Sequence, residues 1–181
     1  MTLDQKLQLW NVIGTWLAGI ATVGAVFVSL YLARSGARVR LHCYAGIRVE
    51  MIGPPGMTRE HICIGVTNLA DRTVTISLVG WAYGGRKKKG VSIQTFAPGI
   101  GDQTPKRIEH GDTAMFMVPL DRNPGWLVRF ATEFITDKPI ERALKTLVVQ
   151  IHPSVGDVIE VKPERVLLDR IHAASKLGEV T

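Results

Sequence analysis

The residues with the most obvious chemistry are four adjacent cations, Arg86-Lys87-Lys88-Lys89, with Gly85 before them and Gly90 after them. Four neighbouring charges between glycines predict a solvated loop, because unpaired cations are almost never buried. Such a loop attracts anions. One candidate is the anionic headgroups of a membrane, to which each cation would contribute about 1 kcal/mol of binding free energy. Another is the phosphates of a nucleic acid, which would be bound without sequence specificity. An ordinary solubilising loop is the third interpretation.

Histidine and cysteine side chains raise the question of a metal site. His61 and Cys63 alternate with isoleucines and so share one side of a predicted strand, and His42 lies on the polar side of a neighbouring strand. Such ligands suit zinc, but no C-x-x-C or H-x-x-x-H spacing and no fourth ligand accompany them. We predict no metal and no cofactor. We also predict no Cys43–Cys63 disulfide, because Cys43 alternates with the apolar set and Cys63 with the polar set.

Motifs of common enzymes do not occur in the sequence. It contains no G-x-S-x-G, no phosphate-binding G-x-x-x-x-G-K-[ST] and no H-E-x-x-H. The run Gly99-Ile100-Gly101 is a fragment of a glycine motif, which we interpret as a turn. Glu109, Asp112 and Asp121 suit turns and loops better than a paired catalytic set. We therefore predict no catalytic residue and a protein that is not an enzyme.

A segment almost without charge precedes these polar residues. Asp4 and Lys6 are the only charged residues among the first 33 of 181, and residues 7–33 have none. As a helix, residues 7–33 would be about 40 Å long, against about 30 Å of bilayer hydrocarbon. We predict a transmembrane helix over about 9–33, since a buried helix of a soluble protein would normally show a polar face.

The charges after this segment indicate its orientation. The whole chain has a net charge of +6, all of it carried beyond residue 33. Arg34, Arg38 and Arg40 follow the predicted helix, whereas the N-terminal side is nearly neutral. By the positive-inside rule, residues 35–181 form a cytoplasmic domain and residues 1–34 hold the outside N-terminus and the helix in the inner membrane. The three arginines and the cations at 86–89 together form the predicted basic patch at the membrane surface.

A cleaved signal peptide is the alternative interpretation of the same segment. Ala33 and Ser35 would suit a cleavage site, but the apolar run is about twice the usual length and its start lacks net positive charge. Aromatic residues instead stand near both ends of the run, where rings prefer the membrane interface. They are Trp10, Trp16 and Tyr31.

Small residues recur on one face of the predicted helix, at spacings of three or four. Small residues let helix backbones approach closely in lipid, where packing drives association. The pattern predicts a homo-oligomer joined through this face, and the alternative is that glycine and alanine are simply common in membrane helices. The residues of this small-residue face are Gly14, Ala18, Ala21, Ala25 and Ser29.

The pattern beyond residue 38 is that of β-strands. Apolar and polar residues alternate over 39–51, and shorter runs follow at 62–66 and 74–78. We interpret the last two runs as a hairpin joined by residues 68–72. Further strands are predicted at 91–95, 114–118, 144–151 and 158–161.

Two helices are predicted in the same region. Asn123 can cap one of them, with Pro124 in its first position, and Pro163 can begin another that Gly178 stops. About seven short strands with one or two added helices predict a two-sheet sandwich. The aromatic residues expected in its interior are Trp81, Tyr83 and Phe116.

Two segments carry a family resemblance. ICIGVTNL (62–69) followed by RTVTI (72–76) resembles a strand–turn–strand of immunoglobulin-like sandwiches, and PKRIEHGDTA (105–114) resembles a P-x-x-L-x-x-G-D/E-x-A turn leading into a later strand. With the preceding Trp-rich helix, the chain is similar to small uncharacterised bacterial membrane proteins, many of them phage- or prophage-associated. The resemblance implies a mainly-β, immunoglobulin-like domain without a Cys–Trp–Cys core, and it implies no activity.

The sequence thus predicts a single-pass inner-membrane protein that presents a cytoplasmic β-rich binding or adaptor domain. Its expected partners are the membrane, anionic lipid headgroups, further copies of itself and an unidentified protein, with nucleic acid less favoured. The alternative is an effector of phage–host conflict. In that case the β domain would sense a nucleotide or phage component, and the oligomeric helix would perturb the membrane.

Overall fold

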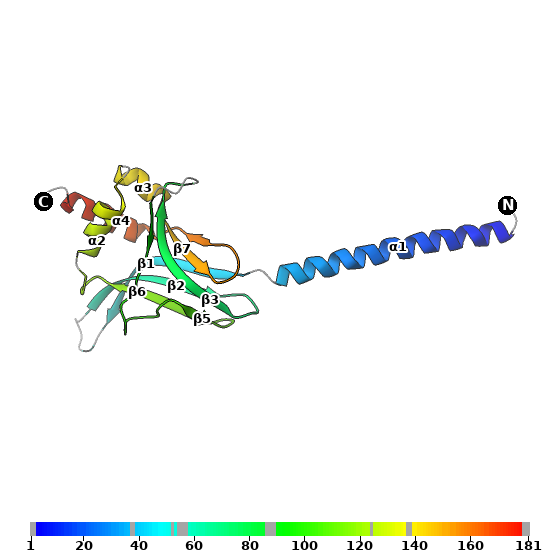
Figure 1. Cartoon of the computed structure of the whole chain (residues 1–181), viewed down its shortest axis with the longest axis horizontal. Coiled ribbons are helices and arrows are strands. Elements are labelled where there is room, and N and C mark those ends of the chain that lie inside the picture. The colour runs from blue at the N-terminus through cyan, green and yellow to red at the C-terminus, as the bar shows by residue number, and fades with distance from the viewer. Residues whose placement is uncertain are drawn as a thin grey trace. The chain divides into compact units, whose positions relative to one another are not determined.

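The computed structural model describes residues 3–36, 39–51, 53, 58–85, 90–123, 125–136 and 139–178. The chain divides into two compact units, Met1–Arg38 and Val39–Thr181 (Figure 1). The first contains one helix and the second contains all the strands.

The first unit is built on the helix α1 (Leu3–Gly36). Within it, Trp10–Leu32 is long and apolar enough to cross a membrane, and none of this stretch is buried. All side chains from 10 to 32 are exposed, so no face of the stretch is covered. The predicted long apolar helix is therefore confirmed. Its length corresponds to about 34 Å of rise, which matches the hydrocarbon thickness.

The second unit is a mainly-β domain of two antiparallel sheets with a few helices. One sheet has the order β1-β2-β6, and the other has the order β4-β3-β7-β8, with β5 also paired to β3 (Figure 1). The strands of the first sheet are β1 (Leu41–Met51), β2 (Thr58–Asn68) and β6 (Thr113–Pro119). Those of the second are β3 (Val74–Tyr83), β4 (Gly90–Ile93), β5 (Lys106–Ile108), β7 (Val148–Pro153) and β8 (Ile159–Val161).

The predicted hairpin of 62–66 with 74–78 is wrong. β2 pairs with β1 on one side and with β6 on the other, so neither of its edges is free for β3. Residues 69–73 instead lead from the first sheet to the second. Asn68 is completely buried where the chain leaves β2, and its side-chain amide donates to the carbonyls of Arg72 (2.7 Å) and Ile108 (3.2 Å).

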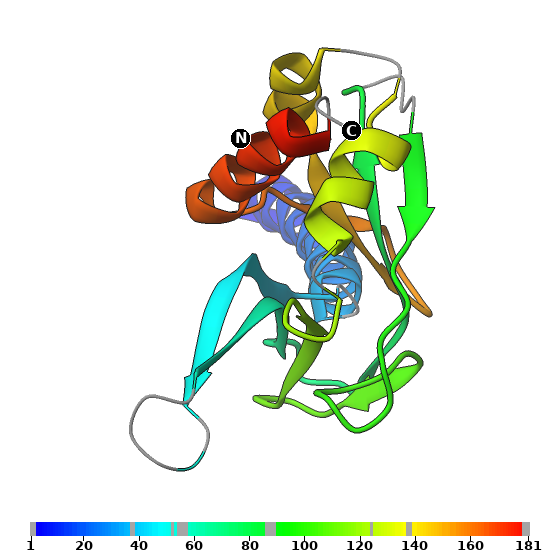
Figure 2. The same ribbon diagram turned by 90° about the vertical axis from the view of Figure 1, so that its left-hand side faces the viewer.

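Helices gather at one end of the two sheets (Figures 1 and 2). They are α2 (Trp126–Arg129), the π-helical turn η1 (Phe130–Phe134), α3 (Ile140–Thr146) and α4 (Arg165–Gly178). The predicted C-terminal helix is confirmed as α4. The predicted cap is wrong, because α2 begins at Trp126 after Gly125 and Pro124 lies outside the described residues. The strand predicted from 144 begins only at Val148, because residues 140–146 form α3.

One hydrophobic cluster joins the sheets and the helices. Ile64 and Phe116 of the first sheet and Trp81 of the second are at most 1% exposed, as is Leu167 of α4. The predicted interior positions of Trp81, Tyr83 and Phe116 are thus confirmed. β2 is buried on both faces, since residues 61–66 are all buried, although the alternation predicted one polar face.

The turn at Gly99 and Gly101 gives a matched pair of tests. Both glycines have positive φ (81° and 64°), which confirms a turn there and costs about 1–2 kcal/mol for a residue with a Cβ. At Gly101 a Cβ would also lie 2.5 Å from the carbonyl oxygen of Met115, whereas at Gly99 it would meet nothing within 4 Å. We expect Gly101→Ala to lower the free energy of unfolding by about 3 kcal/mol and Gly99→Ala by about 1 kcal/mol. Urea unfolding of both variants measures this, and equal losses would contradict the steric argument.

Candidate binding groove

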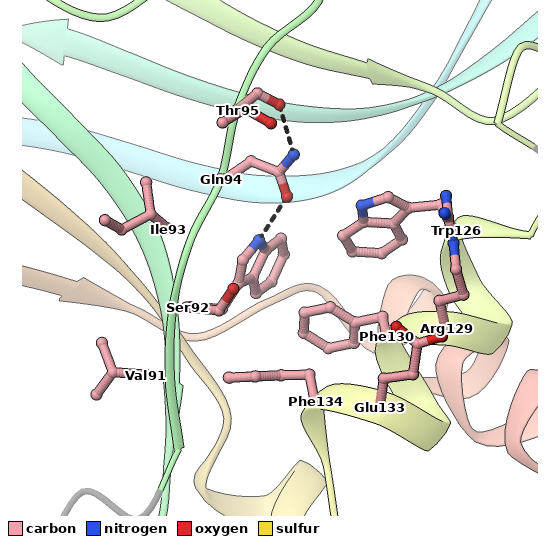
Figure 3. Close-up of a pocket in the computed structure, with 11 residues that line it drawn as sticks. Val91, Ser92, Ile93, Gln94, Thr95, Trp126, Arg129, Phe130, Glu133 and Phe134 are labelled. Atoms are coloured by element: carbon pink, nitrogen blue, oxygen red, sulfur yellow. Dashed lines mark hydrogen bonds between the residues drawn. The ribbon is translucent and has the colours of Figure 1, made fainter.

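A groove lies between β4, with the residues that follow it, and the helical segment α2–η1 (Figure 3). It encloses about 610 Å³, which is within the usual range for ligand sites. Figure 3 shows Val91 and Ile93 pointing away from the helical wall, and Gln94 on the side that faces it. One wall is therefore an edge strand and the other is a short helix.

The helical wall is aromatic. The rings of Trp126 and Phe130 stack at 4.7 Å, and the ring of Phe134 lies 4.9 Å from that of Phe130. Behind them, Trp81 contacts Phe130 edge-on at 5.1 Å, and Tyr83 contacts Phe134 in the same way at 5.2 Å. Trp126 and Phe134 are half-buried, so part of each ring remains accessible. Aromatic surface that is held rigidly and left partly open is typical of binding sites for apolar groups.

Hydrogen bonds fix the floor of the groove. The indole N–H of buried Trp81 donates to Oε1 of Gln94 (3.1 Å), and Nε2 of Gln94 donates to the carbonyl of Thr95 (2.7 Å) (Figure 3). The backbone N–H of Gln94 donates to the carbonyl of Val79 (2.9 Å). The amide of Gln94 thus ties the chain after β4 to the buried strand β3.

A second hollow of about 520 Å³ adjoins the first. It shares Gln94, Thr95, Trp126 and Arg129 with the first and extends it towards Arg122. Among the described residues, its charged lining residues are these two arginines, both of which are exposed, and no acid lines it. The two hollows together form one groove with an aromatic wall and a cationic end. We call it the aromatic groove.

The helix α4 holds the aromatic wall in position. It packs against α2 and η1. The start of α4 is fixed to the edge strand β1, because the N–H of Glu164 donates to the carbonyl of Ala45 (2.8 Å) and its carboxylate accepts two hydrogen bonds from Arg48 (2.8 and 2.6 Å). The hydrogen bonds from Arg48 lower the pKa of Glu164 from its usual value. Because both side chains are about two-fifths exposed, the pair contributes orientation more than stability.

The sequence predicts no groove here. Trp81 is expected only in the interior, and Phe130 and Phe134 are expected only within a predicted helix. One signal was present: Trp126, Phe130 and Phe134 recur at i, i+4 and i+8, which places three aromatic rings on one side of a helix. The sequence does not say that β4 would lie opposite them.

The predicted basic patch lies mostly outside the described residues. Arg38 and the cations at 86–89 are not described, and neither is the side chain of Arg34. In the sequence, the basic run lies between Tyr83, where β3 ends, and Gly90, where β4 begins. Arg40 is exposed, and its carbonyl accepts a hydrogen bond from the N–H of Leu69 (2.8 Å).

His61 and Cys63 lie on the same face of β2, as the alternation predicts, but both are buried. Nε2 of His61 lies 3.8 Å from a carboxylate oxygen of Glu50, and Sγ of Cys63 lies 4.0 Å from the hydroxyl of Tyr44. His42 is exposed. In the described part of the chain, no three His, Cys, Asp or Glu side chains come together as metal ligands.

The two cysteines are free thiols on opposite faces of the first sheet. Cys43 packs against the hydrophobic cluster, and burial raises its pKa from 9.0 to about 11. Burial also raises the pKa of Cys63, although the hydrogen bond with Tyr44 opposes the rise.

We expect the folded protein to resist thiol reagents. Since the thiolate is the nucleophile, a pKa near 11 should slow the reaction of Cys43 about 100-fold at pH 8 compared with the unfolded chain. Cys63 should be slower still, because it is fully buried. The test is to add an aromatic disulfide reagent to the protein with and without guanidinium, and to follow its reduction by the protein thiols through the change in absorbance. Rapid reaction of one thiol in the folded protein would contradict it.

The predicted residues of α1 are all exposed. The interface aromatics Trp10, Trp16 and Tyr31 are 69%, 71% and 73% exposed. The small-residue face, Gly14, Ala18, Ala21, Ala25 and Ser29, is exposed as well. The hydroxyls of Thr15 and Thr22 donate hydrogen bonds of 2.8 Å to backbone carbonyls one turn earlier in the helix. These two polar groups are therefore satisfied within the helix.

Comparisons with known proteins find little similarity. No family model matches the chain, and no curated protein matches it. The solution structure of a putative late embryogenesis abundant (LEA) protein is 9% identical, over 86% of this chain and 90% of that chain, with a TM-score of 0.30. The X-ray structure of a structural-genomics target, SoR45, is 10% identical, over 70% and 82%, with a TM-score of 0.27. Neither similarity supports a statement about fold or function.

Proposed function

We propose that this is a single-pass inner-membrane protein whose mainly-β domain binds a protein partner through the aromatic groove. In this proposal the domain is an immunoglobulin-like sandwich in the cytoplasm, and it acts as an adaptor and not as an enzyme. The observation that carries the proposal is the groove, in which half-buried Trp126 and Phe134 form a partly accessible aromatic surface. The tether would confine binding to the membrane surface and raise the local concentration of the domain.

Crosslinking in native membranes tests the binding role. A photoreactive benzoylphenylalanine replaces Trp126 in the groove, and the control replaces Val155, which is 63% exposed and outside the groove lining. We expect a discrete crosslinked species from position 126 and none from position 155. Crosslinks from both positions, or from neither, would argue against the groove as the binding site.

The proposed orientation rests on the arginines that follow α1. Single cysteines at position 3 and at position 155 report which side is labelled, since both positions are exposed, whereas Cys63 is buried and Cys43 is half-buried. A membrane-impermeant maleimide added to spheroplasts should label position 3 alone. Labelling of position 155 would place the domain outside and would favour export instead.

Two further proposals concern the surfaces around the tether. The small-residue face of α1 would join copies of the protein, so replacing Ala21 and Ala25 by leucine should weaken self-association in a membrane two-hybrid assay.

The basic patch would hold the domain against anionic headgroups. A dye at position 155 and an acceptor lipid in nanodiscs should then report an energy transfer that depends on anionic lipid. Alanine at positions 86–89 should remove that dependence.

The effector function has a distinct signature. If the oligomeric helix perturbs the membrane, overexpression should depolarise cells, and the two leucine substitutions should prevent this. An adaptor predicts no depolarisation, so the membrane potential measured with a voltage-sensitive dye separates the two functions.

A further inference from the structure

We infer that the aromatic groove takes an extended peptide segment of the partner, which adds to β4 as a new strand and places an acidic side chain beside Arg122 and Arg129. The inference rests on the proposed function, because it names the kind of partner that the groove accepts. Three features of the described residues carry it: a free strand edge, an aromatic wall and a cationic end.

The edge of the second sheet offers backbone hydrogen bonds. β4 is the terminal strand of the order β4-β3-β7-β8. Gln94 donates its N–H to the carbonyl of Val79, which makes these two residues a hydrogen-bonded pair. Such pairs occupy every second position of an antiparallel ladder, so Val91 and Ile93 direct their N–H and C=O groups away from β3. A row of outward peptide groups is the template for strand addition.

The side chains around this edge fit an alternating peptide. On one face, the added strand would meet the aromatic wall formed by Trp126, Phe130 and Phe134. On the other face it would lie beside Val91 and Ile93, each 63% exposed. Apolar or β-branched side chains would therefore be favoured on both faces, since cross-strand pairs of these types stabilise a sheet by about 0.2–1 kcal/mol each.

Charge complementarity selects the acidic residue. Arg122 and Arg129 line the second hollow without an acid, and among the described residues neither forms an ion pair. The side chain of Arg129 donates to Asn123, which orients it in the groove. Glu133 lines only the first hollow. An aspartate or glutamate of the peptide would thus bind at the end of the groove beyond Thr95.

The test uses the full-length protein in nanodiscs of neutral lipid. A displayed library of random heptapeptides is selected on it, and the enriched peptides are synthesised and measured by fluorescence anisotropy. We expect apolar residues at alternating positions and an acid near one end. N-methylation of every second peptide nitrogen should weaken binding at least tenfold, and methylation of the intervening nitrogens should leave it unchanged, because only alternate N–H groups face the edge.

Variants of the protein locate the binding surface. Ile93→Pro removes an outward N–H without removing a bond to β3, and its matched control Ile93→Thr keeps the N–H. We expect about tenfold weaker binding for the first and little change for the second. Arg122→Glu should weaken binding of the acidic peptide about tenfold and improve binding of its lysine counterpart. The methylation scan uses the unaltered protein, so it decides the question even if Ile93→Pro fails to fold.

Several results would overturn the inference. The first is that no peptide is enriched over selection on empty nanodiscs. The second is that N-methylation weakens binding equally at adjacent positions of the peptide. The third is that an oligothymidylate binds in a Trp126-dependent manner while the selected peptides do not bind. If a partner is crosslinked at position 126 but N-methylation has equal effects at all peptide positions, strand addition is excluded and the proposed function is still supported. Alternating peptide recognition without any crosslinked partner in membranes supports the inference and removes the proposed adaptor role.

Discussion

Replacing Asn68 with alanine should lower the free energy of unfolding by about 3–4 kcal/mol. The side chain is 0% exposed and makes three hydrogen bonds: its amide donates to the carbonyls of Arg72 and Ile108, and its Oδ1 accepts from the N–H of Ala70 at 2.9 Å. Alanine would leave buried polar groups of Ala70 and Ile108 without these partners, at about 1–3 kcal/mol for each unsatisfied group.

The backbone of Asn68 makes two further hydrogen bonds at the same junction. Its N–H donates to the carbonyl of Asp112 (3.0 Å), and its carbonyl accepts from the N–H of Gly111 (2.8 Å). The residue therefore ties the crossing between the sheets to the turn that precedes β6. Loosening the side chain should expose this junction, so amide exchange at Ala70 should become much faster.

A neighbouring threonine supplies the control for Asn68. Thr67 exchanges a hydrogen bond with Thr113 (2.8 Å) at an exposed position, so Thr67→Ala should cost less than about 1 kcal/mol. Chemical denaturation of both variants in the same detergent measures the difference. Similar losses for the two variants would show that Asn68 does not hold the sheets together.

Two aspartates in the middle of α1 should abolish membrane integration. Ile20 and Val23 lie near the centre of Trp10–Leu32, and both are exposed, at 70% and 56%. An aspartate at the centre of a membrane helix costs about 2.5–3.5 kcal/mol on the insertion scale, so Ile20→Asp with Val23→Asp costs about 5–7 kcal/mol. That exceeds the preference of a single marginal span for lipid, and the protein should become extractable by alkaline carbonate.

The control for this experiment changes the same positions without adding charge. Ile20→Leu with Val23→Leu preserves the apolar length of α1 and should leave the protein resistant to carbonate. Soluble behaviour of the unaltered full-length protein, or an N-terminus that begins after Ser35, would contradict membrane anchoring and favour a cleaved leader. The domain would then act free of the bilayer, and the groove could still be tested as described above.

The edge strand β4 connects the groove with the most basic run of the chain. The run at 86–89, which lies outside the described residues, follows β3 and precedes β4 in the sequence, and these two strands pair with each other. Glycines flank the run: Gly85 has a positive φ of 68°, and Gly90 lies so close to Tyr83 that a Cβ would be 2.1 Å from its ring. The backbone conformation therefore explains the glycine at 85, and close packing explains the glycine at 90, independently of any role for the cations.

Local patterns in the sequence were enough to identify several elements. The run without charge predicted α1, because about 20 apolar residues in a row have few alternatives. Alternation predicted β1 and the inward face of β2, since side chains of a strand point to opposite faces in turn. Leu167, Leu168, Ile171 and Ala174 share one side of the predicted C-terminal helix, because that spacing follows the helical repeat. In α4 all of them are buried except Leu168, which is half-buried.

The tertiary structure alone decided how these elements meet. Alternation reports which residues share a face, but it carries no information on which sheet a strand joins, so it wrongly predicts a hairpin of β2 with β3. It also does not predict the burial of His61 and Cys63, which lie next to Glu50 and Tyr44 of β1. The groove arises in the same way. Its two walls, at Ser92 and at Phe130, are distant in sequence and meet only through packing, which no local pattern contains.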